Sequence, residues 1–165
     1  MTSLDYILAF SFSLLAVLLI LGLLRFLSGS AAKNWKKHRA ETVDLWEADG
    51  VEFELGPSGG RFCGLESMGD NFGARDFGII AITTEDLRVT RMSPMAVWCI
   101  PFKEIKSIAF EAEFLGNRAT KTPFTVVEFT QDGQVDNLGF QIAAYDEWAE
   151  KLADLADVPL YEMEE

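Results

Sequence analysis

An uncharged apolar run near the N-terminus constrains this chain more than any other feature. From Tyr6 to Leu24 there is no Asp, Glu, Lys or Arg, and Leu, Ile, Val, Phe and Ala dominate. As a helix rising 1.5 Å per residue, this run would extend roughly 28 Å, close to the roughly 30 Å hydrocarbon core of a bilayer. A helix satisfies its own backbone hydrogen bonds, so such a run can cross lipid. The sequence therefore predicts a transmembrane anchor over residues 1–27.

A cleaved signal peptide is the alternative for this run. Signal peptides begin with positive residues and have an apolar core of about 7–15 residues. Here Asp5 precedes the run, no Lys or Arg does, and the run is longer. Ser28, Ser30 and Ala32 are small enough to suit a cleavage site, so the alternative stays open, but a retained anchor is favoured.

A basic segment follows the run, and residues 28–42 are expected to form a juxtamembrane linker or short helix. The residues expected at the membrane interface are Arg25, Lys33, Trp35, Lys36, Lys37 and Arg39. Positive residues flanking a span stay on the cytoplasmic side. We therefore expect a single-pass membrane protein, with its N-terminus outside and residues 28–165 in the cytoplasm. Anionic lipid headgroups would stabilise each such cation by about 1 kcal/mol, although a merely solvated linker fits the same topology.

The rest of the chain is far more acidic than the total charge suggests. The whole chain carries -12, but residues 41–165 hold 25 Asp and Glu against 9 Lys and Arg, a net charge of -16. Such a surface repels phosphate backbones and anionic headgroups. We therefore expect no nucleic acid as partner and no docking of this domain itself on an acidic membrane.

Alternating apolar residues after residue 43 predict a series of short strands. Residues 51–55 (VEFEL) alternate cleanly, residues 56–60 (GPSGG) have the composition of a turn, and QDGQ (131–134) is a hairpin signal. The period then changes to that of an amphipathic helix over residues 145–157, with Asp146 as its expected N-cap. The predicted fold class is mainly β with one C-terminal helix, a small barrel or sandwich over residues 43–158, followed by an acidic tail over residues 159–165.

Two motifs in this region resemble the bacterial pleckstrin-homology-like (PH-like) family, which includes GRAM-type modules. They are GIIAITTEDLRV leading into CIPFKEIKSIAF, with TVVEF, LGFQI and YDEWAEKL further on. The positions that match the family pattern are Ile79, Ile80, Thr83, Leu87, Ile100, Pro101, Phe102 and Ile105. The resemblance covers about residues 50–156, and it implies a small β barrel whose last helix plugs one open end.

The chain departs from the lipid-binding members of that family. Those members carry Lys and Arg clusters in the first hairpin, whereas residues 51–63 contain Arg61 as their only cation, beside two glutamates. No residue is therefore carried over as a lipid ligand. Many members are protein-interaction scaffolds, which suits the acidic surface better.

No pattern for catalysis, cofactor binding or metal binding is found. His38, in the basic segment, is the only histidine, so a Ser-His-Asp or Cys-His arrangement in the domain is excluded. No glycine-rich phosphate or dinucleotide motif is present, and two cysteines 36 positions apart are not zinc spacing. We therefore predict no catalytic, cofactor or metal residues, and expect Cys63 and Cys99 to be reduced and buried.

Candidate contact residues come from aromatic and small side chains. Phe72, Phe77 and Phe114 flank predicted loops, so they are either covered by their own domain or exposed as anchors for a partner. Ala9 and Ser13 are four residues apart within the apolar run, which would permit close packing against another membrane helix.

These features predict a non-catalytic, single-span accessory subunit or scaffold of a larger membrane protein complex, with an acidic cytoplasmic interaction domain. The alternative is a free-standing membrane-anchored sensor or lipid-binding module. An enzyme of unrecognised type is the third possibility, and it has no motif in its favour.

Overall fold

The computed structural model of the chain describes residues 17, 20, 35–69, 76–92 and 95–162. The chain divides into two compact units, Met1–Thr42 and Val43–Glu165. The second unit is mainly β with a helix near its C-terminal end, which confirms that part of the predicted fold class.

A helix covers residues 35–48. The later elements are, in chain order, β1 (Phe53–Leu65), η1 (Glu66–Met68), β2 (Asp76–Thr83), β3 (Asp86–Arg91), β4 (Ala96–Pro101), η3 (Phe102–Glu104), β5 (Ile105–Glu111), β6 (Glu113–Phe114), β7 (Asn117–Arg118), β8 (Phe124–Gln131), β9 (Gln134–Ile142), α2 (Tyr145–Ala156) and β10 (Leu160–Tyr161).

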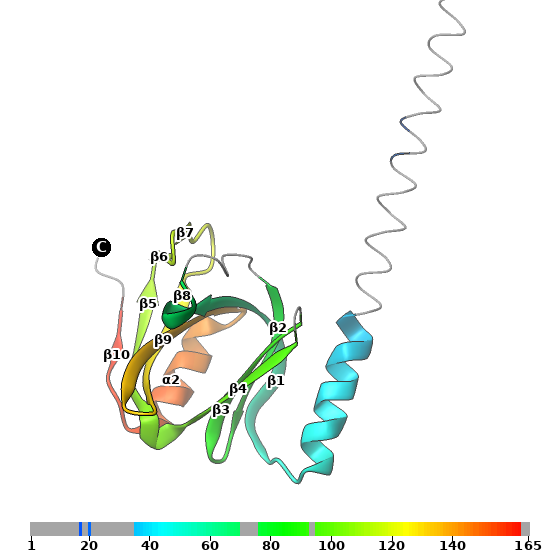
Figure 1. The fold of residues 1–165 in the computed structure, drawn as a ribbon, viewed down its shortest axis with the longest axis horizontal. Coiled ribbons are helices and arrows are strands. Elements are labelled where there is room, and N and C mark those ends of the chain that lie inside the picture. Colours follow the sequence, from blue (N-terminus) through cyan, green and yellow to red (C-terminus); the bar gives the residue numbers. More distant parts are fainter. Residues whose placement is uncertain (1–16, 18–19, 21–34, 70–75, 93–94, 163–165) are drawn as a thin grey trace, which may run out of the picture. The chain divides into compact units, whose positions relative to one another are not determined.

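One curved sheet forms most of the domain, in the order β10-β5-β8-β9-β1-β2-β3-β4. All neighbouring strands are antiparallel except β10, which lies parallel to β5. The long strand β1 joins the two halves, because residues 53–62 pair with β2 and residues 60–65 pair with β9. Figure 1 shows the result: the sheet curves around α2, with β1 to β4 on one side and β5, β8 and β9 on the other.

The expected turn at residues 56–60 is wrong, because these residues lie inside β1. The pairing of β1 with β2 is irregular there, with register shifts between Phe53 and Leu55 and between Leu55 and Ser58. A Cβ atom at Gly60 would lie 2.5 Å from the Ile80 side chain and 3.0 Å from the Gln141 carbonyl oxygen. Small residues therefore allow one bent strand to pass closely between β2 and β9 instead of reversing the chain.

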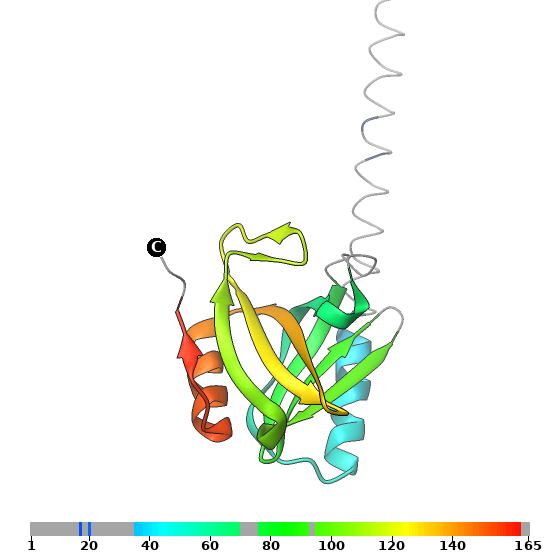
Figure 2. The same cartoon turned by 60° about the vertical axis from the view of Figure 1, so that its left-hand side comes forward.

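The core lies between the concave face of the sheet and α2. On the helix, Trp148, Ala149 and Leu152 are buried, as their spacing along the sequence predicts. They belong to the same apolar cluster as Phe62 and Phe140 from the sheet. Figure 2, turned by 60° from Figure 1, shows α2 (orange to red) at one side of the curved sheet, next to β10.

The start of α2 differs from the sequence prediction. Its N-cap residue is Ala144, which has a φ of 56° and makes no side-chain capping hydrogen bond, whereas Asp146 is already in the first turn. A carboxylate in the first turn still interacts favourably with the positive end of the helix dipole, which explains why acidic residues gather there without capping.

The segment predicted to be an acidic tail, residues 159–165, includes β10. Leu160 and Tyr161 pair with Ile108 and Ala109 of β5, and the Ile108 amide also donates a 3.1 Å hydrogen bond to the Pro159 carbonyl. The chain therefore returns to the sheet after α2 and covers the edge of β5 over a short length.

No helix among the described residues is both long and apolar enough to cross a membrane. The predicted span over residues 6–24 lies outside the described residues apart from Val17 and Ile20.

Candidate interaction surfaces

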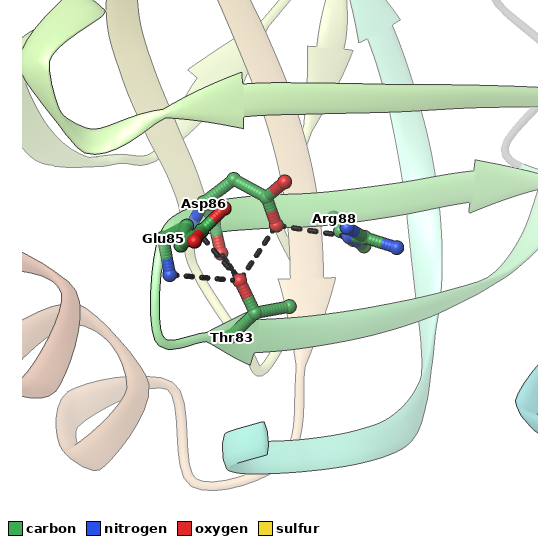
Figure 3. A network of polar contacts seen from close by, with 4 residues as sticks. All are labelled: Thr83, Glu85, Asp86 and Arg88. Atoms are coloured by element: carbon green, nitrogen blue, oxygen red, sulfur yellow. Dashed lines mark hydrogen bonds and ion pairs between the residues drawn. The ribbon is translucent and has the colours of Figure 1, made fainter. Parts of the chain in front are cut away.

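A buried polar network fixes the turn between β2 and β3 (Figure 3). The Thr83 hydroxyl oxygen accepts hydrogen bonds from the backbone amides of Glu85 and Asp86, at 3.1 and 2.9 Å. The same hydroxyl donates to the Asp86 carboxylate at 2.7 Å, and the Arg88 Nε atom donates to that carboxylate at 2.9 Å. Because these buried groups satisfy one another, the turn holds β3 in a single register, and β3 in turn positions β4.

Arg88 is engaged by its own domain. Its burial disfavours the charged form, but the hydrogen bond and the negative charge of Asp86 outweigh this and raise the pKa of Arg88. Its guanidinium also lies 5.8 Å from the centre of the Trp46 ring, and that ring lies 6.1 Å from the Phe53 ring. This cation therefore stabilises the fold and is poorly placed to bind an anionic ligand.

The strand β4 is a free edge of the sheet. It pairs only with β3 among the described residues, through six consecutive residue pairs without a register shift. The Phe102 amide donates to the Glu85 carbonyl on the β3 side. Hydrogen-bonded pairs alternate in antiparallel strands, so, counting from Phe102, the backbone groups of Ile100, Trp98 and Ala96 bond to β3. The amide and carbonyl groups of Val97 and Cys99 therefore point away from the sheet.

A groove of about 490 Å³ runs beside this free edge. Its lining comes from two segments: Cys99, Ile100, Pro101 and Glu104 on the β4 side, and Phe129, Thr130, Gln131, Asp132 and Gly133 from the β8–β9 hairpin. The lining contains two carboxylates, those of Glu104 and Asp132, and no lysine or arginine.

Apolar side chains are exposed at the edge strand β4 and on β2, two strands away. The exposed fractions are 57% for Phe77, 63% for Met95 and 43% for Val97. Val97 pairs with Thr90, and the Thr90 hydroxyl accepts a hydrogen bond from the Ile79 amide, so these three residues lie side by side across the strands. Side chains two residues apart on a strand share a face, so Phe77 lies on the same face as Ile79 and Val97. Met95 and Val97 therefore give the free edge exposed apolar side chains, and Phe77 lies on the same face two strands away.

A second groove, of about 390 Å³, lies over β5 and β8 on the face opposite the core. The hairpin of β6 and β7, which Figure 2 shows projecting beyond the end of β5, contributes Glu113 and Phe114 to its lining. Four carboxylates line the groove: Glu66, Glu111, Glu113 and Glu128. Ala109 and Val126 add small or apolar surface, and the lining contains no lysine or arginine. We call this the acidic groove.

The predicted membrane-interface residues fall partly within the described chain. Trp35, Lys36, Lys37 and Arg39 lie on the helix over residues 35–48, where Lys36, Lys37 and Arg39 are exposed. The Lys37 ammonium lies 3.6 Å from the Glu41 carboxylate, one helical turn away. Arg25 and Lys33 lie outside the described residues, as do Ala9 and Ser13, the predicted helix-packing pair.

The three candidate partner-contact aromatics have different surroundings. Phe77 is exposed at 57%, whereas Phe72 lies outside the described residues. Phe114 is half-buried, with its ring 6.2 Å from that of Phe124. A Cβ atom at Gly139 would clash with the Phe114 ring. The absence of a side chain at Gly139 therefore lets Phe114 pack against its own domain.

The two cysteines also differ. Cys63 is buried, as predicted, and its thiol lies 3.5 Å from the Arg61 carbonyl oxygen. The prediction that Cys99 is buried is wrong, because Cys99 lies on the outward face of the edge strand. Partial desolvation raises the pKa of the Cys99 thiol, and the nearby Arg88 charge only partly opposes this. The thiol therefore stays protonated at neutral pH, unlike an activated nucleophile.

The acidic groove and the free edge were not predicted from the sequence. The glutamates come from segments as distant as Glu66 and Glu128, and only the pairing of β5 with β8, of β8 with β9 and of β9 with β1 brings them together. Nothing in a single sequence shows that the uncharged strand β4 lies at an edge of the sheet. Among the described residues, no three His, Cys, Asp or Glu side chains are placed to hold a metal ion.

These observations define a mainly β domain with a helix packed in its core, two grooves lined by carboxylates and one uncharged sheet edge. No family model and no curated protein sequence matches this chain. Among solved structures, it is similar to the hSac2 domain from the human phosphoinositide phosphatase Sac2, with a TM-score of 0.55 and 11% identity over 78% of this chain and 91% of that one. At this identity the similarity shows the fold and assigns no activity.

Proposed function

We propose that this protein is a non-catalytic, single-span accessory subunit or scaffold of a larger membrane protein complex, with a PH-like interaction domain. In this proposal residues 1–27 anchor the chain in a bacterial inner membrane, and the basic residues after the span keep the domain in the cytoplasm. The anchor and its orientation rest on the uncharged run over residues 6–24 and on the asymmetry of Lys and Arg around it.

The arrangement of the domain supports a PH-like fold. The motif residues from Ile79 to Leu87 form the β2–β3 hairpin, and the residues from Ile100 to Ile105 form the corner of β4, η3 and β5. The last helix, α2, packs into the core through Trp148 and Leu152, in the manner that the family resemblance implies.

The acidic groove is the observation that carries the interaction role. Its carboxylates surround a concave surface with room for long side chains, and they come from a domain whose net charge is -16. A lysine or arginine side chain would lay its aliphatic stem on Ala109 and Val126 and bring its charge to these carboxylates. We therefore propose that the groove contacts a basic segment of the partner complex.

Purification of the full chain in a mild detergent tests this function. We expect an integral membrane protein to co-purify in a fixed ratio, and the double variant Glu111→Lys and Glu128→Lys to reduce its recovery by about tenfold or more, because charge reversal turns attraction into repulsion. Quantitative mass spectrometry of the purified material measures the ratio.

The matched control is the double variant Glu147→Lys and Glu150→Lys, which makes the same charge change at two exposed positions of α2 away from the groove. It should leave recovery unchanged. Recovery of the wild-type protein as a monomer alone, or equal losses in the groove and control variants, contradicts the proposal.

A lipid-binding module is the second candidate, because the similar domain belongs to a phosphoinositide phosphatase. The described grooves argue against it, since both are lined by carboxylates without a lysine or arginine. We expect inositol 1,4,5-trisphosphate, titrated into the full chain in a neutral detergent, to leave the tryptophan fluorescence unchanged. Saturable binding in the micromolar range, lost on charge reversal of Arg61, would instead favour the lipid-binding function.

A further inference from the structure

We infer that the free edge of β4 accepts an extended segment of a partner polypeptide, which adds to the sheet as a further strand with a lysine or arginine close to Glu104 and Asp132. This surface is separate from the acidic groove, and the inference goes beyond the proposed function by naming how a partner would be bound.

The first argument is that β4 lacks the features by which sheet edges are normally protected. Protected edges are short, charged, bulged or interrupted by proline. β4 is six residues long, its pairing with β3 shows no bulge, and it contains no charged residue. Its only proline, Pro101, is the last residue of the strand. The opposite edge of the sheet is different, because β10 is only two residues long and is followed by Glu162.

The second argument is that the outward backbone groups of β4 are accessible. The residues whose amide and carbonyl groups point away from β3 are Val97 and Cys99, and both residues are exposed. They are two positions apart, which is the spacing at which an added strand forms its ladder of hydrogen bonds. Pro101, the next residue in this series, has no amide hydrogen and offers only its carbonyl.

The third argument is that the surroundings define the chemistry of the added strand. Met95 and Val97 present exposed apolar side chains at the edge, so apolar side chains at alternate positions of the added strand would be covered there, on the face that also carries Phe77 two strands away. At the other end of β4, the groove carries the Glu104 and Asp132 carboxylates and no cation. An apolar strand with a terminal lysine or arginine complements both features.

Charge also argues against a second copy of this chain as the occupant. β4 is itself uncharged, so two copies could pair through it, but each would bring a domain of net charge -16 close to the other. Repulsion of this kind opposes association. A basic partner segment gains from the same field.

The test uses the full chain in neutral detergent and a synthetic peptide, acetyl-KVTVTVK-amide, which carries a cation at each end so that either strand direction is allowed. Hydrogen–deuterium exchange is followed at the backbone amide of Val97. We expect saturating peptide to slow this exchange by about tenfold, as new ladder hydrogen bonds protect the amide. The peptide acetyl-EVTVTVE-amide should give much less protection at the same concentration.

Two variants at one position provide the matched control. Cys99→Pro removes an amide hydrogen that points away from β3, so it should abolish the protection of Val97 while the β3–β4 pairing persists. Cys99→Ser changes the same side chain but keeps the amide, and it should bind the peptide like the wild type. Should Cys99→Pro fail to fold, the wild-type protein is tested with KVTVTVK N-methylated at each valine and threonine, which cannot complete the ladder in either strand direction and should not protect Val97.

Three outcomes overturn the inference: no protection of Val97 by KVTVTVK, equal protection by the lysine and glutamate peptides, or equal protection by the N-methylated peptide. Protection of Val97 that rises with protein concentration in the absence of peptide also overturns it, because the occupant would then be a second copy. None of these outcomes bears on co-purification through the acidic groove, so failure of this inference is distinguishable from failure of the proposed function.

Discussion

Replacing Phe62 with alanine should lower the free energy of unfolding by about 3–5 kcal/mol, the range observed when a large buried aromatic side chain is truncated. Phe62 is 1% exposed and lies where β1 passes from β2 to β9, paired with Asp76 on one side and Phe140 on the other. Its ring is stacked on that of Trp98, with the centroids 4.5 Å apart and the planes inclined by 4°.

The loss of Phe62 also affects a buried charge. The guanidinium carbon of Arg91 lies 5.9 Å from the centres of both the Phe62 and Trp98 rings, and Arg91 is only 6% exposed. Truncation therefore removes one of the two aromatic faces near this cation in addition to creating a cavity. Denaturant unfolding of the full chain, followed by circular dichroism, measures the change.

Phe77→Ala is the control for this prediction. It removes the same side chain from a neighbouring strand, but at a position that is 57% exposed, so stability should change by no more than about 0.5 kcal/mol. Similar losses for the two variants would mean that the core is not organised around Phe62.

The second large effect is expected for Trp148→Ala, which should cost about 3–5 kcal/mol because it removes the largest side chain with which α2 contacts the sheet. Trp148 is 5% exposed and belongs to the main core cluster. Its ring also reaches the bent part of β1: a Cβ atom at Gly56 would lie only 2.7 Å from it. The midpoint of unfolding by urea reports the loss.

The matched substitution is Glu147→Ala, one residue earlier on the same helix but exposed. It tests whether α2 contributes to the stability of the domain through its buried side chains or through its helical propensity alone. We expect almost no change in stability. A loss as large as that of Trp148→Ala would show that the helix is sensitive to any substitution and that the indole has no special role.

Much of the β domain could be predicted from the sequence because its strands alternate strictly or are continuously apolar. The residues of β2, β3, β4, β8 and β9 have these patterns, and Trp148 and Leu152 have helical spacing. The failures occurred where local composition and tertiary packing disagree. Turn-forming residues at 56–60 lie within β1 because glycine permits the close approach of Ile80 and Gln141 at Gly60.

The interaction surfaces could be predicted only in part. The exposure of Phe77 was one of two alternatives considered from the sequence, and this side chain is 57% exposed in the structure. The position of Phe114 depends on a glycine in another strand, Gly139, which leaves space for its ring. The acidic groove depends on the register of β5 with β8 and of β8 with β9, and a single sequence does not reveal which distant strands are neighbours.

The short strand β10 has a consequence for how copies of this protein can assemble. Joining molecules head to tail through their sheets would require the β4 edge of one copy to meet the opposite sheet edge of the next, and such open contacts propagate into filaments. At that opposite edge the strand β10, which is only two residues long, lies against the middle of β5. A strand of two residues offers too few backbone hydrogen bonds to pair with β4 of the next copy. The edge of β4 can therefore stay exposed without leading to head-to-tail filaments.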